Sequence, residues 1–223
     1  MGLNKKEMAS YGIGAVGKDM VYMFCASYIL YYYQDILGVS AIAMGIILLA
    51  ARVFDAFNDP IMGVVVAKTR TRWGKFRPWL FIGTLLNAVV LFLMFSAPPT
   101  LDGGGLVAYA AVTYVLWGVT YTMMDIPYWS MIPAFTEGGK ERENMSGVGS
   151  ALVTIITMQC VYMLGNGNEY AGFKWFALII SILFFTAILI TCFNIREKST
   201  VDVETVSVKQ MFKALFQNDQ AVT

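Results

Sequence analysis

Long apolar stretches separated by short polar segments dominate the sequence. A helix that crosses a bilayer needs about 20 mostly apolar residues. Six stretches of the chain meet this requirement: 11–33, 41–66, 78–95, 106–127, 146–164 and 173–193. The third opens with Pro78, and proline suits the first turn of a helix because its missing N–H needs no partner there. The pattern therefore predicts an all-α membrane protein with six transmembrane helices.

The polar segments between these stretches alternate in basic charge. One side of the predicted membrane carries a single basic residue, Lys174, and the other side carries 13. These 13 are Lys5, Lys6, Lys68, Arg70, Arg72, Lys75, Arg77, Lys140, Arg142, Arg196, Lys198, Lys209 and Lys213. Cytoplasmic loops are enriched in lysine and arginine, so we expect both termini in the cytoplasm.

The composition changes after the sixth apolar stretch. Residues 197–205 are polar, and between positions 206 and 216 apolar side chains recur at helical spacing beside two lysines. Such a pattern is typical of an amphipathic helix that lies on a membrane surface. We therefore divide the chain into a six-helix transmembrane bundle, residues 1–196, and a cytoplasmic middle-loop segment, residues 197–223.

The overall composition supports a membrane protein and argues against several other classes. Apolar residues make up 57% of the chain, charged residues only 14%, and the mean hydropathy is +0.61, whereas a soluble surface needs more charge. A net charge of +1 argues against a nucleic-acid partner. The chain has no histidine, which excludes histidine proton relays and Ser-His-Asp catalysis. We expect a protein that is not an enzyme.

Four carboxylates lie at membrane depth: Asp19, Asp55, Asp59 and Asp125. A charged residue at the centre of a membrane helix costs about 3 kcal/mol on insertion scales, so each carboxylate is a candidate functional residue. The structural alternative is that each one merely pairs with a neighbouring helix.

The second apolar stretch contains a candidate cation site. Arg52, Asp55 and Asp59 are spaced i, i+3, i+7 and therefore share one helix face. Two carboxylates one turn apart repel each other in a low dielectric, and a small cation held by carboxylate and amide oxygens relieves that repulsion. Asn58 supplies an amide oxygen, and Pro60 frees a backbone carbonyl one turn earlier. The alternative is that one aspartate is protonated.

The fourth apolar stretch contains a candidate sugar site. Thr122, Asp125 and Trp129 repeat the i, i+3, i+7 spacing, and Tyr121 lies one turn before Asp125. A carboxylate accepts hydrogen bonds from sugar hydroxyls, and an aromatic ring covers the C–H face of a sugar. Trp129 taken alone would more often be a residue of the interfacial aromatic belt.

Lys18 and Asp19 lie in the first apolar stretch. Adjacent residues on a helix point about 100° apart, so we expect that the two charges do not pair with each other. Each needs other partners, which suits a polar cavity. The charges also interrupt the apolar run, so this stretch does not read as a cleavable signal peptide.

Four segments resemble the glycoside–pentoside–hexuronide:cation symporters, a family of the major facilitator superfamily. They are Tyr11–Asp19, Arg52–Gly63, Arg72–Trp79 and Tyr121–Trp129. The resemblance implies a fold of twelve helices in two six-helix halves. This chain would hold the N-terminal half, and a C-terminal six-helix half would be its partner.

The resemblance also implies roles for the candidate residues. The cation site would consist of Asp55, Asn58, Asp59 and Thr122. The sugar site would be lined by Lys18, Asp19, Tyr121, Asp125 and Trp129. Arg52 would be a nearby charged residue that is important for transport and coupling.

These observations lead to one main hypothesis and two alternatives. The main hypothesis is a sodium-coupled sugar symporter in the inner (plasma) membrane, with sodium as the coupling ion and no other cofactor. One alternative is a proton-coupled relative; Asn58 beside Asp59 favours sodium, because a proton needs a base but no cage of oxygens. The other is a membrane module that binds a sugar without transporting it. The sequence does not identify the sugar.

Overall fold

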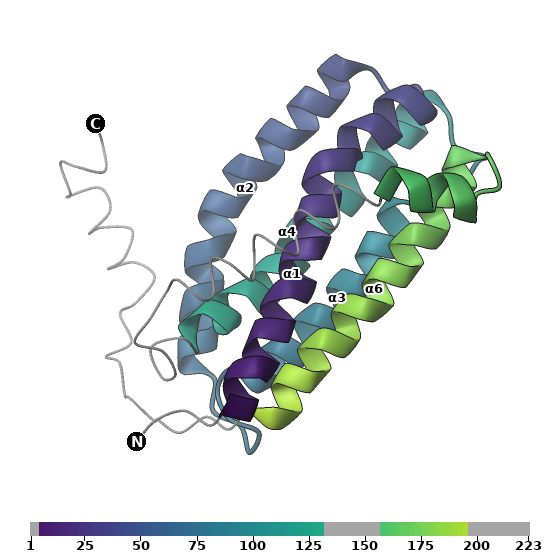
Figure 1. The fold of residues 1–223 in the computed structure, drawn as a ribbon. Coiled ribbons are helices and arrows are strands. Elements are labelled where there is room, and N and C mark those ends of the chain that lie inside the picture. The colour runs from purple at the N-terminus through teal and green to yellow at the C-terminus, as the bar shows by residue number, and fades with distance from the viewer. Residues whose placement is uncertain (1–4, 132–156, 196–223) are drawn as a thin grey trace, which may run out of the picture.

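The computed structural model describes residues 5–131 and 157–195 and consists of helices joined by short loops (Figure 1). Its elements are α1 (Lys5–Tyr31), the π-helical segment η1 (Tyr32–Ile36), α2 (Ala41–Lys68), α3 (Arg77–Met94), α4 (Gly103–Ser130) and α6 (Glu169–Asn194). Residues 157–164 are also helical.

Within these described ranges, five helices are long and apolar enough to cross a membrane, so the chain is a multi-pass membrane protein. They match the first four predicted stretches and the sixth. Of the fifth, only residues 157–164 lie within the described ranges. The amphipathic helix predicted between positions 206 and 216 lies outside the described residues.

Local sequence explains where two of the helices begin. The Ser40 hydroxyl accepts a hydrogen bond from the backbone N–H of Ala43 at 3.2 Å, at the start of α2. The Asn168 side chain accepts one from Ala171 at 3.3 Å, at the start of α6. Both residues satisfy a backbone donor that the first helical turn leaves unpaired. α3 has proline in its first turn, as predicted from Pro78.

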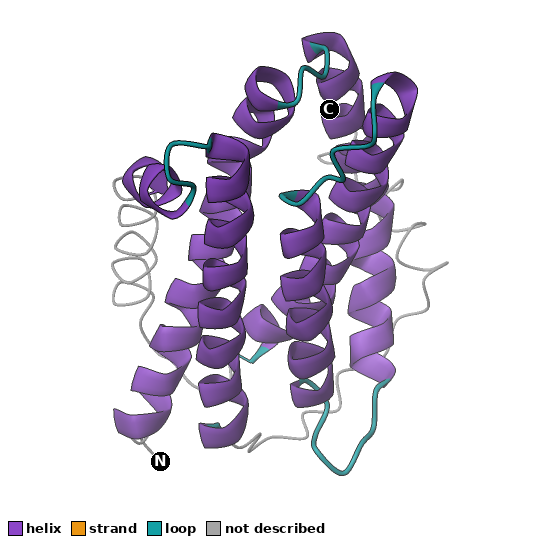
Figure 2. Cartoon of the chain, turned by 90° about the vertical axis from the view of Figure 1, so that its right-hand side faces the viewer, coloured by secondary structure: helices purple, strands orange, loops and turns teal. Residues whose placement is uncertain are grey.

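The helices run side by side along one axis (Figures 1 and 2). α1 packs against α6, α3 packs against both α4 and α6, and α2 packs against α4. An aromatic group made by Phe24, Phe95 and Phe173 joins α1, the end of α3 and α6. The ring centroids of Phe24 and Phe95 lie 4.5 Å apart, and those of Phe95 and Phe173 lie 5.9 Å apart. Aromatic pairs at such distances attract each other beyond their burial of apolar area.

Glycine permits two close helix contacts. A Cβ atom at Gly17 on α1 would lie 2.7 Å from the Cβ of Ala187 on α6. A Cβ atom at Gly83 on α3 would lie 2.9 Å from the backbone nitrogen of Met124 on α4. Small residues let membrane helices approach closely, and the resulting van der Waals contacts hold the helices together. The second contact fixes α3 against the part of α4 that bears the candidate site.

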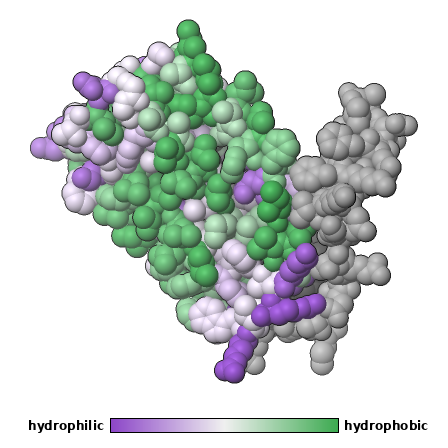
Figure 3. All heavy atoms as spheres, turned by 180° about the vertical axis from the view of Figure 1, so that it is seen from behind, coloured by the Kyte–Doolittle hydropathy of each residue, from purple (hydrophilic) through white to green (hydrophobic). Residues whose placement is uncertain are grey.

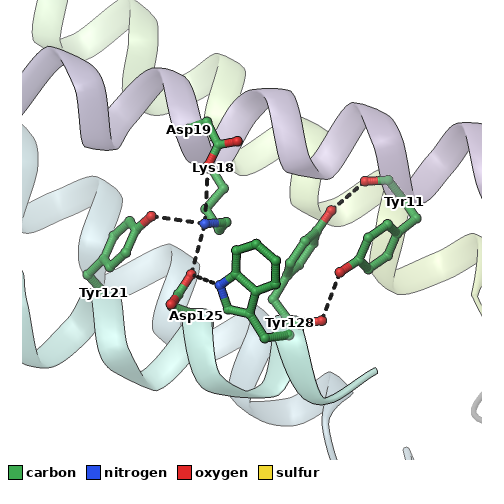
Figure 4. A network of polar contacts seen from close by, with 7 residues as sticks. Tyr11, Lys18, Asp19, Tyr121, Asp125 and Tyr128 are labelled. Carbon is green, nitrogen blue, oxygen red and sulfur yellow. Dashed lines mark hydrogen bonds and ion pairs between the residues drawn. The ribbon is translucent and has the colours of Figure 1, made fainter. Parts of the chain in front are cut away.

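Four helix termini meet at one end of the bundle. Nε of Arg77, at the start of α3, donates a hydrogen bond to the carbonyl oxygen of Cys192 near the end of α6 at 2.7 Å. The Tyr11 hydroxyl on α1 donates to the carbonyl of Tyr128 near the end of α4 at 3.0 Å, and the Tyr128 hydroxyl donates back to the carbonyl of Tyr11 (Figure 4). These contacts connect α1 to α4 and α3 to α6.

The lateral surface of the bundle is apolar. In Figure 3, hydrophobic residues cover most of the visible face, and hydrophilic residues gather toward its two ends. On α2, Ile42 is 78% exposed, Ile46 63% and Leu49 68%. Water would disfavour such a surface, so these side chains require contact with lipid or with another apolar protein surface.

Candidate functional site

A largely buried charge cluster joins α1 to α4 (Figure 4). The Lys18 ammonium lies 2.9 Å from Oδ1 of Asp125 and 3.2 Å from Oδ1 of Asp19. It also donates a hydrogen bond to the Tyr121 hydroxyl at 3.2 Å. The Lys18 side chain is only 5% exposed. A buried ammonium group is tolerated when it is paired and hydrogen-bonded, and the cluster provides both kinds of partner.

The contact between Lys18 and Asp19 corrects the expectation that these neighbours do not pair. Their Cα–Cβ bonds do diverge around the helix, as adjacent residues must. The lysine stem is long and flexible enough to bring its ammonium group back to the neighbouring carboxylate. Lys18 therefore balances two carboxylates, one on its own helix and one on α4.

Trp129 completes the cluster. Its Nε1 donates a hydrogen bond to Oδ1 of Asp125 at 2.8 Å, and the Lys18 ammonium lies 4.8 Å from its ring centroid. An ammonium group near an aromatic face is attracted by the ring quadrupole. Two donors thus converge on one oxygen of Asp125 and hold the carboxylate in one orientation. Trp129 as a whole remains 38% exposed and offers an aromatic ring close to that carboxylate.

The residues predicted for the cation site lie on α2 and α4. The Thr122 hydroxyl on α4 donates a hydrogen bond to Oδ1 of Asp59 on α2 at 2.9 Å. Asp55 lies one turn earlier on α2 and contacts α4 at Gly118, where an added Cβ would lie 3.0 Å from Oδ1 of Asp55. A side chain at position 118 would press directly on this carboxylate. The glycine therefore gives Asp55 room beside α4.

Asn58, the fourth residue of the predicted cation site, and Arg52, the predicted coupling residue, are placed differently. Arg52 interacts with the Tyr22 side chain and electrostatically with Asp55, but in the described part of the chain it forms no ion pair with either aspartate within 4.0 Å. The side-chain nitrogen of Asn58 is buried and has no hydrogen-bond partner within residues 5–131 and 157–195. Among the described residues, no three His, Cys, Asp or Glu side chains converge as a metal site. A cation here would need neutral oxygens besides the two carboxylates.

One cavity connects the two sets of residues. Its volume is about 180 Å³. Asp55, Asp59 and Thr122 of the predicted cation site line it, together with Tyr121 and Asp125 of the predicted sugar site. Arg52 also lines it. Lys18, Asp19, Trp129 and Asn58 are not part of its lining. The structure therefore brings the aspartates of α2 and the Asp125 carboxylate of α4 to a shared space, with Lys18 and Asp19 behind Asp125.

Sequence reasoning missed four residues of this cavity wall: Tyr22, Trp117, Gly118 and Ile126. Their spacing could have identified them. Tyr22 follows Lys18 by four residues, and Ile126 follows Thr122 by four. Trp117 and Gly118 precede Tyr121 and Thr122 by four. Residues four apart lie on the same helix face. Extending each predicted stripe by one helical turn would have included all four.

Comparison with known proteins gives one family match and several relatives. The sequence profile of the family described as MFS/sugar transport protein matches residues 10–223. The chain is 32% identical over 225 residues to the inner membrane symporter YicJ of Escherichia coli strain K12, covering 98% of this chain and 49% of that protein. It is 29% identical over 223 residues to the isoprimeverose transporter of Lactiplantibacillus pentosus, covering 95% of this chain and 46% of that protein.

A third relative has a similar coverage. The putative glycoside/cation symporter YagG of Escherichia coli strain K12 is 32% identical over 226 residues, which cover 98% of this chain and 49% of that protein. The chain therefore spans about half the length of the curated relatives that it matches. These relatives are named as symporters and transporters, not as enzymes.

Proposed function

Since this chain belongs to the MFS/sugar transport protein family, we propose that it is the N-terminal six-helix half of a sodium-coupled glycoside symporter. A second six-helix half would complete the transporter. We further propose that the protein lies in the inner (plasma) membrane with both termini of this chain in the cytoplasm.

The observation that carries this proposal is the cavity shared by the two sets of residues. Asp55, Asp59 and Thr122 line it beside Tyr121 and Asp125. A ligand with several hydroxyl groups would bind at Asp125 and the nearby aromatic rings, and a cation would bind at the aspartates of α2. The volume of about 180 Å³ is smaller than the roughly 300–1,000 Å³ of typical ligand pockets. This favours a sugar site to which another part of the protein contributes a wall.

The geometry also supports a route for coupling. Thr122 touches Asp59 at 2.9 Å, and Asp125 follows Thr122 by three residues on the same helix. A cation bound between Asp55 and Asp59 would reduce their repulsion and fix α4 against α2 through Thr122. This would order Asp125 and Trp129 before the sugar binds. Coupling of this kind is reciprocal, so the sugar would tighten cation binding by the same factor.

Sodium is the preferred coupling ion in this proposal. The site combines carboxylate oxygens with the Thr122 hydroxyl, and Asn58 lies one residue before Asp59. Hard cations bind such oxygen ligands, whereas a proton needs only one of the aspartates. Proton coupling through Asp59 is the alternative, and a sugar-binding module without transport is the second alternative.

Calorimetry on the full-length gene product tests the proposal. We expect a p-nitrophenyl glycoside to bind more tightly in sodium chloride than in choline chloride at the same pH and ionic strength. Asp59→Cys should lose this difference and keep the basal affinity, because the sugar contacts at Asp125 remain. Equal wild-type affinities in both salts would overturn the sodium assignment. Binding without sodium-driven uptake into proteoliposomes would favour the non-transporting module.

A further inference from the structure

Trp117 lines the cavity, and its side chain carries an unused hydrogen-bond donor. It lies on α4 one turn before Tyr121, it is only 7% exposed, and it lines the same cavity as Asp55 and Asp125. Its Nε1–H is buried and has no hydrogen-bond partner among the described residues. Buried indole N–H groups usually have a partner, so an unpaired one beside a cavity indicates a missing acceptor.

Neighbouring rings and a backbone contact hold the Trp117 indole in place. It is stacked with Tyr121 at a centroid distance of 5.3 Å and an interplanar angle of 27°, and with Tyr114 at 5.9 Å and 26°. Tyr22 on α1 also stacks with it, at 6.3 Å. The side chain of Asn87 on α3 donates to the Trp117 carbonyl at 3.0 Å. The direction of the N–H is thus set before a ligand binds.

The neighbouring groups limit what the missing acceptor can be. An N–H donor repels a cation, so the missing acceptor of the Trp117 N–H is not a cation. In the described structure, Asp59 accepts a hydrogen bond from Thr122, and Asp125 is paired with Lys18 and Trp129. A ligand hydroxyl fits the remaining requirement. It can accept from an indole N–H while donating its own proton to a carboxylate.

We propose that Trp117 donates a hydrogen bond to one hydroxyl of the bound sugar and is a specificity-determining residue. Its stacked ring together with Tyr121 would form an aromatic wall for the sugar, in addition to the Trp129 face. This inference rests on the proposed sugar-binding function. It predicts that one particular hydroxyl of the sugar is recognised through Trp117.

A double-mutant cycle between protein and sugar tests the inference. The probes are p-nitrophenyl α-galactopyranoside, β-xylopyranoside and β-glucuronide, followed by the monodeoxy derivatives of the tightest binder. Wild-type and Trp117→Phe forms of the full-length gene product are compared in sodium chloride. The matched control is Trp175→Phe, because Trp175 is 49% exposed on α6. Such a cycle isolates one pairwise interaction.

The expected result is specific to one hydroxyl. For the wild type and for Trp175→Phe, removal of that hydroxyl from the sugar should weaken sugar binding about threefold to tenfold, as for the loss of a neutral hydrogen bond. For Trp117→Phe, the parent sugar and this deoxy derivative should bind equally. If Trp117→Phe lowers the melting temperature, 3-benzothienyl-alanine at position 117 keeps the ring shape without the N–H and should give the same pattern.

Two results would overturn the inference. If the Trp117 variants respond to every deoxy sugar as the wild type does, Trp117 donates to no sugar hydroxyl. If they change the affinity for sodium but not the pattern among the sugars, Trp117 serves the cation site instead. Failure of the wild type to bind any of the three probes, with or without sodium, would overturn the proposed function as well. It is distinguished from the first two results because they require a wild type that binds sugar.

Discussion

At the scale of single residues, Lys18 is the positive charge that makes the candidate sugar site possible. Its ammonium lies within 3.2 Å of Asp19 and 2.9 Å of Asp125 while its side chain is 5% exposed. Without it, two carboxylates from different helices would face each other in a partly buried space. Two anions in that situation repel, or one of them becomes protonated. In the proposed sugar site, Lys18 would therefore act on the ligand mainly by fixing Asp125.

Replacing Lys18 tests this role. We expect Lys18→Met to destabilise the protein by roughly 2–4 kcal/mol, somewhat below the cost of breaking a fully buried pair, because Asp19 and Asp125 are partly exposed. Sugar binding should be lost. Adding Asp125→Asn should restore much of the stability, since one unbalanced charge is removed, but not the binding.

Thermal unfolding in detergent and sugar calorimetry provide the two measurements for Lys18. Lys174→Met is the control, because Lys174 lies in the first turns of α6 away from the cluster, and it should leave both quantities unchanged. A Lys18→Met protein that is as stable as the wild type would contradict the charge-balance argument.

The contacts of Lys18 also mark what sequence alone could predict about the site. The i, i+3, i+7 spacing predicted that Thr122, Asp125 and Trp129 share a face, and Trp129 does contact Asp125. Spacing on one helix says little about the path of a flexible side chain. The prediction that Lys18 and Asp19 do not pair was therefore wrong. Spacing also cannot show which buried donors stay unpaired, so the unpaired N–H of Trp117 emerges only from the packed structure.

At the scale of helices, α4 is the element on which both candidate sites depend. It packs against α2, which carries Asp55 and Asp59, and against α3 on its other side. Gly83 makes the α3 contact close, since a Cβ there would meet the backbone of Met123 and Met124 at 3.0 and 2.9 Å. Backbone atoms cannot move aside as a side chain can. The position of the stripe from Trp117 to Trp129 thus depends on a glycine of the neighbouring helix.

Alanine at position 83 tests this dependence. We expect Gly83→Ala to push α3 from α4 and to cost about 1–3 kcal/mol, as overpacking of a core does. Because α4 would shift, sugar affinity should fall as well. Gly45→Ala on α2 is the matched control, since a Cβ there meets nothing within 4 Å. Melting temperature and sugar affinity measure the two effects, and equal values for the two variants would refute the packing argument.

Hydropathy predicted the helices more reliably than their ends. α2 begins at Ala41, where the prediction began, because the Ser40 cap coincides with the edge of the apolar stretch. α1 begins at Lys5 and continues as the π-helical η1 to Ile36, beyond the predicted range 11–33. An apolar stretch marks the part of a helix that lies in lipid, and a helix can extend past it into polar surroundings. The π-helical turn has no signal in hydropathy, because it arises from backbone hydrogen bonding.

At the scale of the whole molecule, the two ends of the helix bundle differ in their number of basic residues. The start of α1, the α2–α3 loop and the end of α6 lie at one end of the bundle (Figure 1). That loop and its flanking residues contain Lys68, Arg70, Arg72, Lys75 and Arg77. The opposite end contains the α1–α2 connection, the start of α4 and the start of α6, with Lys174 as its basic residue. In the described bundle, successive connections thus alternate between a basic end and an end with little basic charge, as the sequence predicts.

Reporter fusions test the orientation that follows from this asymmetry. Lysine and arginine in short loops keep those loops in the cytoplasm, and 13 basic residues stand against one. Alkaline phosphatase fused after Gly103, at the start of α4, should be active outside the cytoplasm. A green fluorescent protein fused after Gly139, which lies outside the described residues, should fluoresce inside the cell. The reciprocal fusions are the control and should both be inactive. If Gly103 and Gly139 report the same side, α4 does not cross the membrane, and a transporter half with six spanning helices is ruled out.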